Sequence, residues 1–270
     1  MLAISDQDFS LLTDYVKRNF GINLSQKRTL IEGRLSNLVL EKGFGSFAEY
    51  LQFVFSDASR SEITVLLDKL TTNHTFFMRE NEHFWYFRDQ VLPYLRSNVK
   101  SRDLRIWSAG CSTGQEPYTL AMLIAEFLGA EKSVWDAKIL ATDISSSVLQ
   151  TAAQGCYPAD SLSDIPASWK LNYFRKPSKD WFQVTEAIKK EVVFRRFNLI
   201  GSEFPFRRKF HVIFCRNVMI YFEQPVKMNL VRMFHEFTEP GGYLFLGLSE
   251  GLGRHESEYV SVMPAIYRKR

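Results

Sequence analysis

The sequence predicts an α/β protein in which an all-helical N-terminal region precedes a large α/β domain. Up to about residue 90, apolar residues recur with the spacing of amphipathic helices. After about residue 100, short apolar stretches typical of buried strands alternate with helical stretches. Strands that alternate with helices build a parallel sheet with helices on both faces. Between residues 157 and 197 three prolines interrupt this alternation, which indicates a small inserted unit.

The N-terminal region is expected to contain four helices. Ser5 precedes acidic residues and an apolar set that ends at Val16, which is the pattern of a capped amphipathic helix. A second helix is expected from near Ser25 to the glycines that begin at Gly43, where the helix stops. Two more are expected, the third from Ser46 through Val54 and the fourth over Glu62–Leu70.

The α/β domain is expected to contain four strands and three helices. The predicted strands are Leu104–Trp107, Lys138–Thr142, His211–Cys215 and Tyr243–Leu246. The predicted helices are Glu116–Gly129, Ser145–Gln154 and Gln224–Phe237. Two further β-like stretches, Trp181–Val184 and Val192–Phe197, are assigned to a small antiparallel insertion.

The composition excludes several classes of protein. With 46% hydrophobic and 24% charged residues, the chain is neither disordered nor fibrous. No apolar run approaches the ~20 residues that span a bilayer, and the first residues lack the basic and apolar regions of an export signal. The three cysteines show no CxxC spacing, which argues against a disulfide framework or a zinc site. We therefore expect a cytoplasmic protein with no metal and no direct membrane insertion.

Positive charge is concentrated near the N-terminus. Between Lys17 and Lys42, six basic residues stand against two acidic ones, so this stretch alone carries the whole net charge of +4. Lys27 and Arg34 are seven residues apart and lie along one side of the predicted second helix. A local basic region favours an acidic partner surface over general nucleic-acid binding. The alternative is that these charges only keep a surface helix soluble.

A glycine-containing turn follows the first predicted strand. Gly110 and Gly114 let the backbone approach a ligand at the carboxyl edge of the sheet, where open α/β sheets bind ligands. The turn is neither the dinucleotide GxGxxG motif nor the phosphate-binding GxxxxGK[ST] motif. A plain tight turn without a ligand is the alternative.

Asp143 ends the second predicted strand. An acid at this point can accept hydrogen bonds from ribose hydroxyls. It lies 33 residues after Gly110, whereas about 20 is typical of dinucleotide folds, and this longer spacing disfavours a nicotinamide cofactor. Asp143 could instead cap the following helix, for which the serines from Ser145 to Ser147 also compete.

Six motifs, taken in order along the chain, resemble those of the chemoreceptor glutamate methyltransferase family (CheR type). The resemblance covers nearly the whole chain, and the string Phe-Cys-Arg-Asn-Val-Met-Ile-Tyr-Phe is its most specific part. The motifs are Thr71–Glu80, Trp107–Tyr118, Ala141–Ile144, Phe197–Leu199, Phe214–Phe222 and Gly247–Glu250.

The resemblance implies both a domain organisation and an activity. It implies an N-terminal helical domain over 1–75, a linker over 76–95 and a class I (Rossmann-like) methyltransferase domain over 96–270, with a β-subdomain at about 157–197. The implied activity is methyl transfer from S-adenosylmethionine to glutamate side chains of bacterial chemoreceptors, as part of sensory adaptation in chemotaxis. The implied products are glutamyl methyl esters and S-adenosylhomocysteine.

The resemblance also implies the residues of the site. Asn73, Thr75 and Arg79 are expected to approach the cofactor from the interdomain segment, while Glu116 and Asp143 hold its amino-acid and ribose portions. The full implied cofactor-binding set is Asn73, Thr75, Arg79, Gly110, Glu116, Asp143, Ile144, Asn198, Leu199, Arg216 and Asn217. Arg79 and Tyr221 are expected near the transferred methyl group. The alternatives are a surface ion pair of Arg79 with Glu80 or Glu82, and a core aromatic role for Tyr221.

The receptor is the expected partner, and nucleic acid is not. Lys27, Arg28 and Arg34 are candidates to dock the Glu-rich receptor helices. Some family members also tether to a receptor's C-terminal peptide through a longer, glycine-containing loop of the β-subdomain. The corresponding stretch here, Arg175–Trp181, is short and has no glycine, so we expect no tether. The competing functions are methylation of another protein or of a nucleic acid, and a non-catalytic module that senses the cofactor or binds receptors.

Overall fold

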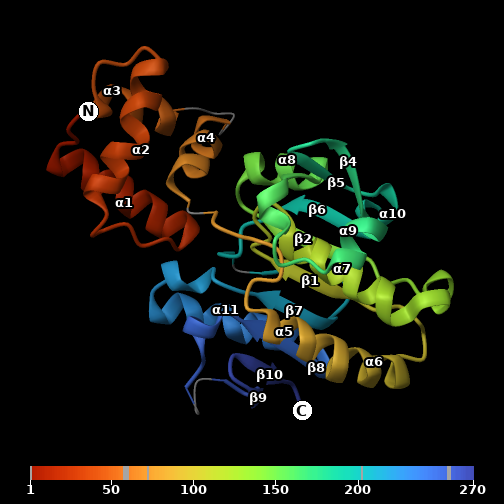
Figure 1. Cartoon of the computed structure of the whole chain (residues 1–270). Helices are drawn as coiled ribbons and strands as arrows, with labels where there is room; N and C mark the ends of the chain where they lie inside the picture. The colour runs from red at the N-terminus through yellow and green to blue at the C-terminus, as the bar shows by residue number, and fades with distance from the viewer. Residues whose placement is uncertain (1, 57–60, 72, 202, 254–256) are drawn as a thin grey trace.

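The computed structural model describes residues 2–56, 61–71, 73–201, 203–253 and 257–270. Thr72, which belongs to the first motif, therefore lies outside the described residues. A bundle of helices at the N-terminus lies beside a larger α/β part that is built on a central sheet (Figure 1). Within the described residues, no helix has both the length and the apolar character that a membrane crossing requires.

The four predicted N-terminal helices are confirmed. Ser5 caps the first of them, because its side chain accepts a hydrogen bond from the Asp8 backbone N–H. Gly21 ends the same helix in the left-handed conformation. Buried leucine, isoleucine and aromatic side chains from all four helices form one core. The helices are α1 (Asp6–Phe20), α2 (Arg28–Glu41), α3 (Phe47–Ser56) and α4 (Ser61–Leu70).

A seven-stranded sheet forms the centre of the α/β part, in the order β6-β2-β1-β7-β8-β10-β9. The first five strands in this order are parallel, and four of them, β2, β1, β7 and β8, were predicted as strands of a parallel sheet. β10 pairs with β8 and with β9 in antiparallel fashion. The two central strands, β1 and β7, are buried along their whole length because both faces of the sheet are covered there. The strands are β1 (Ile106–Ala109), β2 (Ile139–Asp143), β6 (Val192–Arg196), β7 (Phe210–Cys215), β8 (Thr238–Leu246), β9 (Val260–Met263) and β10 (Ile266–Arg268).

Alternate residues of the strands point to two separate apolar cores. On one face, Phe214 and Phe245 stack on each other and pack against α5 (Asn81–Tyr86), the π-helical turn Phe87–Val91, α6 (Leu92–Asn98) and α7 (Gln115–Leu128). On the other face, Trp107 packs against Phe234 of α11 (Gln224–Phe237) and against several phenylalanines of the segment that precedes β7. The helix α8 (Ser146–Gln154) lies against β2 and β6.

The inserted β-subdomain is smaller than the sequence predicted. It is a three-stranded antiparallel sheet in the order β3-β5-β4, built from β3 (Cys156–Pro158), β4 (Phe174–Ser178) and β5 (Trp181–Val184). The prediction that Val192–Phe197 belongs to this insertion was wrong, because Val192–Arg196 pairs in parallel with β2 in the main sheet. Short helices connect these strands, namely α9 (Ala167–Tyr173) and α10 (Glu186–Lys189).

The segment that the sequence assigned to a linker packs into the α/β core. Phe77, Phe84 and Phe87 are all buried and belong to the same apolar cluster as the sheet residues. Their burial holds the backbone between α4 and α6 against the sheet, so the chain reaches β1 along a fixed route. The exact domain boundaries stay a prediction.

Candidate active site

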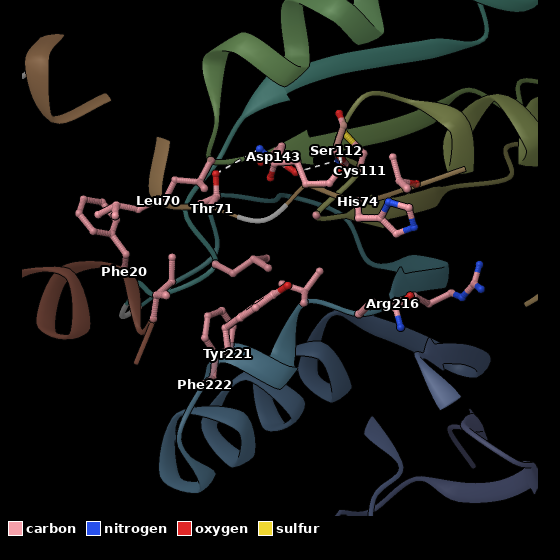
Figure 2. A pocket seen from close by; sticks show the side chains of 18 of the residues that line it. Phe20, Leu70, Thr71, His74, Cys111, Ser112, Asp143, Arg216, Tyr221 and Phe222 are labelled. Atoms are coloured by element: carbon pink, nitrogen blue, oxygen red, sulfur yellow. Dashed lines mark hydrogen bonds between the residues drawn. The ribbon is translucent and has the colours of Figure 1, made fainter. Parts of the chain in front are cut away.

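A deep cleft separates the helical part from the carboxyl edge of the sheet. Phe20, Ile22, Leu24, Lys27 and Leu30 line it from the helical part. The ends of β1, β2 and β7, together with the segment that follows α4, line it from the other side (Figure 2). Two parts of the chain that fold around separate cores therefore share one cavity.

All twelve residues that the resemblance implied as cofactor-binding or catalytic line this cleft, whereas Gly114 is not among its lining residues. The set that the structure brings together is Asn73, Thr75, Arg79, Gly110, Glu116, Asp143, Ile144, Asn198, Leu199, Arg216, Asn217 and Tyr221. Their individual roles stay predictions. Among the described residues, no group of three or more His, Cys, Asp or Glu side chains is arranged to hold a metal ion.

The turn after β1 requires glycine. Gly110 has a φ of +84°, and a Cβ atom there would lie 2.3 Å from Cγ2 of Val218. Gly114, which begins α7, has a φ of +95°, and a Cβ atom there would lie 2.9 Å from Cβ of Ala152. The tight-turn interpretation is thus correct for the backbone. It does not exclude binding, because Gly110 also lines the cleft.

Asp143 ends β2 with its carboxylate fixed by backbone donors. Its Oδ2 accepts the Ser112 N–H at 2.8 Å (Figure 2). Its Oδ1 accepts the Ser145 N–H at 3.0 Å. Burial raises the pKa of Asp143, and these two hydrogen bonds oppose the rise. The capping alternative for Asp143 was wrong, because Ser145 caps α8 through its own hydroxyl. Each carboxylate oxygen keeps acceptor capacity for a further donor.

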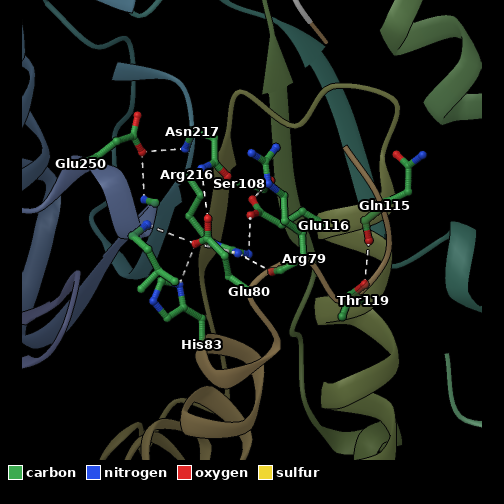
Figure 3. A network of polar contacts seen from close by, with 12 residues as sticks. Arg79, Glu80, His83, Ser108, Gln115, Glu116, Thr119, Arg216, Asn217 and Glu250 are labelled. Atoms are coloured by element: carbon green, nitrogen blue, oxygen red, sulfur yellow. Dashed lines mark hydrogen bonds and ion pairs between the residues drawn. The ribbon is translucent and has the colours of Figure 1, made fainter. Parts of the chain in front are cut away.

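Arg216 is a buried cation between two carboxylates. Its side chain is 2% exposed, with Nη1 3.2 Å from Oε2 of Glu116 and Nη2 3.1 Å from Oε2 of Glu80 (Figure 3). The guanidinium also lies over the Phe84 ring and donates to the backbone carbonyl of Arg79. Its Nε has no hydrogen-bond partner among the described residues. The arginine therefore holds the end of β7, the start of α7 and the segment after α4 together at the cleft.

The two carboxylates beside Arg216 have pKa values shifted in opposite directions. The pKa of Glu116 is raised, because the effect of burial exceeds the opposing effects of the Arg216 charge and of a hydrogen bond from Ser108. Burial also acts to raise the pKa of Glu80, but hydrogen bonds from Asn217 and the Arg216 charge outweigh it, so that pKa is lowered. Burial and the same charge lower the pKa of His83 to about 4, so this neighbour of Glu80 is neutral at pH 7.

Glu80 and Glu250 were missed as site residues by sequence reasoning. Glu80, in the left-handed conformation at a φ of +53°, accepts hydrogen bonds from Asn217 Nδ2 and the Leu248 N–H. Glu250 accepts the N–H groups of Asn217, Ile220 and Gly247 (Figure 3). Together the two carboxylates fix the turn that follows β7. Their place inside two of the motifs was the one signal available in the sequence.

Arg79 lines the cleft, and its guanidinium contacts residues of its own segment. Nη1 donates to the carbonyl oxygen of His74 at 2.7 Å, and the guanidinium lies 5.9 Å from the centre of the Phe76 ring. The predicted alternative of an ion pair with Glu80 or Glu82 was wrong within the described residues, since Glu80 binds Arg216 instead. Arginine has five N–H donors, so several remain for a ligand.

Tyr221 ends a short 3₁₀ helix, Met219–Tyr221, at the cleft. It is half-buried and packs on the apolar cluster of the second sheet face while it lines the cleft (Figure 2). The core-aromatic alternative therefore describes one side of the ring only. Its backbone carbonyl accepts the N–H of Asn23 from the helical part at 2.9 Å.

Asn198 is another link between the two parts of the chain. Its Nδ2 donates to the backbone carbonyl of Asn19 at 2.8 Å, and its Oδ1 accepts the Ile200 N–H at 3.0 Å. Within the α/β wall, the carbonyl of Asn73 accepts the Ser112 hydroxyl at 2.8 Å. This hydrogen bond ties the segment after α4 to the turn after β1.

Comparison with known proteins assigns both parts of the chain to one family. A family model described as "CheR methyltransferase, all-alpha domain" matches residues 7–71, and one described as "CheR methyltransferase, SAM binding domain" matches residues 73–267. The chain is 44% identical to a chemotaxis protein methyltransferase of Borreliella burgdorferi, over 99% of this chain and 96% of that protein.

More distant relatives carry similar names. The chain is 36% identical to chemotaxis protein methyltransferase 1 of Pseudomonas aeruginosa, with all of both chains covered. It is 32% identical to the chemotaxis protein methyltransferase of Escherichia coli, over 98% of this chain and 92% of that protein. These matches extend over the helical part and the α/β part alike, and thus over both walls of the cleft.

Proposed function

The chain belongs to the CheR methyltransferase family, and from that membership we propose that it transfers the methyl group of S-adenosylmethionine to glutamate side chains of bacterial chemoreceptors. The products would be glutamyl methyl esters and S-adenosylhomocysteine. One observation supports the proposal most directly. Motifs from distant parts of the chain line a single cleft, with Arg79 and Tyr221 among its lining residues.

The residues of the cleft suit S-adenosylmethionine. Asp143 presents buried acceptor oxygens at the tip of β2, where ribose hydroxyls can donate to them. Gly110 has no side chain between the backbone and a ligand. In the amino-acid portion, the Glu116 carboxylate offers an acceptor for the ammonium group. Arg216 Nε, which has no hydrogen-bond partner among the described residues, offers a donor for the carboxylate group. The ribose and the amino-acid portion thus each have a chemically matched partner.

The reaction needs alignment more than acid–base catalysis. A glutamate side chain has an ordinary pKa of about 4.3 and is ionised at neutral pH, so no general base is required. S-adenosylmethionine supplies an electrophilic methyl group on a sulfonium. The bond between a glutamate oxygen and the methyl carbon forms as the carbon–sulfur bond breaks, and its electron pair goes to sulfur.

Arg79 and Tyr221 are the residues proposed to provide this alignment. Arg79 orients the substrate carboxylate through charge-assisted hydrogen bonds, and the Tyr221 hydroxyl positions it by a single weaker bond. The cleft keeps bulk water from the nucleophile, which favours in-line attack. The chain's part in the chemistry is therefore to bind, orient and desolvate two reactants.

The proposal is tested with labelled S-adenosylmethionine and receptor cytoplasmic fragments. We expect label in the fragments that mild base releases as methanol, because carboxyl methyl esters hydrolyse under conditions that leave N-methyl groups intact. The control fragment has glutamine in place of the candidate glutamates and should stay unlabelled. Base-stable label would favour methylation of another kind of group, and cofactor binding without any transfer would favour a non-catalytic module.

The basic residues near the N-terminus have different surroundings. Arg34 caps α4, since its Nη1 donates to the carbonyls of Leu70 and Thr71 at 2.9 and 3.0 Å. Arg28 pairs with Asp6 and lies over the Phe9 ring. Lys27 is exposed and lines the cleft. We therefore propose that Lys27, supported by Arg28, faces the acidic receptor helix, and that Arg34 acts mainly by holding α4.

Charge reversal at Lys27 is expected to weaken receptor docking. Lys27→Glu should raise KM for receptor fragments about threefold to tenfold at low ionic strength, and less in high salt, because exposed charge pairs are weak and screened. The measurement is a series of initial rates over ionic strength. Lys138→Glu is the matched control, because Lys138 is exposed just before β2, at the opposite edge of the sheet. Equal KM values and equal salt slopes for the two variants would rule out docking through Lys27.

The hairpin of the β-subdomain supports the proposal of a tether-independent enzyme. Only Lys179 and Asp180 separate β4 from β5. A turn this short offers little chain with which to enclose a peptide. In the labelling experiment, receptor fragments with and without their C-terminal tail are therefore expected to react at equal initial rates. A slower reaction of the tail-less fragment would contradict this.

A further inference from the structure

The backbone of Tyr221 is paired with a segment of the helical part. Immediately after α1, Ile22 forms an antiparallel bridge with Phe222. The adjacent Asn23 N–H donates to the Tyr221 carbonyl at 2.9 Å. These contacts lie at Tyr221, the last residue of the 3₁₀ helix Met219–Tyr221, and at Phe222, which follows it. The position of the tyrosine is thus defined partly by residues about 200 positions earlier in the chain.

Glu223 connects the same two segments through its side chain. Its Oε1 receives the Lys17 ammonium at 2.7 Å and the Asn23 Nδ2 at 3.1 Å. Glu223 is also the residue that precedes the first turn of α11, so its backbone is anchored by that helix. The carboxylate therefore joins the end of α1, the segment after α1 and the start of α11 at one point.

Close packing supports the hydrogen bonds. Gly21 has a φ of +71°, and a Cβ atom there would lie 2.8 Å from Cγ1 of Ile200 and 3.3 Å from Cγ1 of Val226. Ile22 packs against the apolar core of the helical part and against the core on the α11 face of the sheet. The contact is therefore made of backbone, apolar and charged components at the same place.

We propose that these contacts form an interdomain latch, consisting of Lys17 and Gly21–Asn23 on one side and Tyr221–Glu223 on the other, which fixes Tyr221 for methyl transfer. Glu223 is then a positioning residue, because it acts on the reaction through the backbone of Tyr221. The inference rests on the proposed function of Tyr221. It goes beyond that function by assigning the helical part a role inside the catalytic step, in addition to substrate docking.

The test compares Glu223→Ala with Glu223→Gln. The alanine variant loses both hydrogen bonds, and we expect kcat to fall about fivefold to tenfold, because small displacements of an aligning group are costly in rate. KM for the receptor fragment and Kd for S-adenosylmethionine should stay within about twofold. Glutamine keeps an acceptor oxygen for both donors, so Glu223→Gln should retain most of the activity.

Glu236→Ala is the matched control on the same helix. Glu236 is half-exposed and pairs with Arg232 at 2.6 Å on the surface of α11, so its loss should leave kcat unchanged. A kcat for Glu223→Ala within twofold of the wild-type value would overturn the proposal. So would a glutamine variant as slow as the alanine variant, or a change confined to KM, since a docking or purely structural role would produce those results.

Hydrogen exchange tests whether the latch exists, and this test needs no substrate. Peptides that cover residues 19–24 and 217–223 should exchange faster in Glu223→Ala than in the wild type, and at the wild-type rate in Glu236→Ala. Unchanged exchange in Glu223→Ala would overturn the latch even if the enzyme methylates receptors. A wild-type enzyme that fails to esterify glutamates would contradict the proposed function, while the exchange result would still stand.

Discussion

Arg79→Ala is expected to lower kcat/KM for receptor methylation by about 100-fold. Hydrogen bonds between charged groups contribute about 1.5–3 kcal/mol each, and the misaligned carboxylate adds a further loss in rate. Arg79→Lys should recover only part of the activity, because an ammonium cannot form the bidentate contact that a guanidinium forms. Steady-state rates with receptor fragments at saturating S-adenosylmethionine measure both effects.

Tyr221→Phe is the companion to this variant and should have the smaller effect. Removing one hydroxyl should lower kcat/KM about tenfold, since it removes a single hydrogen bond to the ionised carboxylate, and the lower end of the range for such bonds is about 1.5 kcal/mol. Arg232→Ala is the arginine control, because Arg232 lies on the exposed face of α11 in a pair with Glu236. If Arg79→Ala and Tyr221→Phe both left kcat/KM unchanged, the proposed catalytic roles would have to be abandoned.

Arg216→Met is expected to cause the largest loss of stability. The variant leaves the Glu80 and Glu116 carboxylates buried with no cation between them, and breaking a buried pair in this way costs about 3–5 kcal/mol. For a chain of this size the corresponding fall in Tm is on the order of 10 °C. Urea unfolding at pH 7 measures the loss directly.

The loss of stability in Arg216→Met should be smaller at acidic pH. In the wild type, the lowered pKa of Glu80 means that its contribution to stability is present at neutral pH and disappears as the pH falls through the folded-state pKa. In Arg216→Met, the carboxyl groups should have raised pKa values and should protonate readily, so the difference in stability between the variant and the wild type should decrease as the pH falls. Adding Glu116→Gln to Arg216→Met should restore part of the stability at pH 7. If Arg216→Met alone were as stable as the wild type at pH 7, Arg216 would not be needed to balance the charges of Glu80 and Glu116.

The parts of the fold that the sequence predicted are those with a strong local pattern. The four N-terminal helices, α7, α8 and α11 were all identifiable from the spacing of apolar residues. Four of the five parallel strands, β2, β1, β7 and β8, were identifiable because each contains a buried apolar stretch. The first strand begins at Ile106, two residues later than predicted.

The parts that were missed depend on contacts between distant residues. Val192–Arg196 follows the antiparallel hairpin closely, but it pairs with β2, and nothing in its own composition indicates that partner. The hairpin of β9 and β10 consists of two very short strands at the sheet edge, whose apolar pattern is weak. Likewise, the segment after Phe77 has no strong local sign that it packs in the core of the α/β part.

In the candidate site, too, the residues within a local motif were predicted, and those that depend on distant partners were missed. The motifs led to every lining residue that was singled out, because each is attached to a glycine turn, a strand end or a characteristic string. Glu80 and Glu250 escaped notice because their importance lies in donors that come from elsewhere, such as the Leu248 and Asn217 N–H groups. A pattern within one segment cannot reveal such partners.

The shared cleft also bears on how members of this family can exchange parts. A chimera that joins the helical half of one relative to the α/β half of another would keep both folds, since each has its own core. It would place unmatched surfaces where Asn19 meets Asn198 and where Asn23 meets Glu223. Recombination within the family should therefore give active enzymes only when these interface residues are exchanged together.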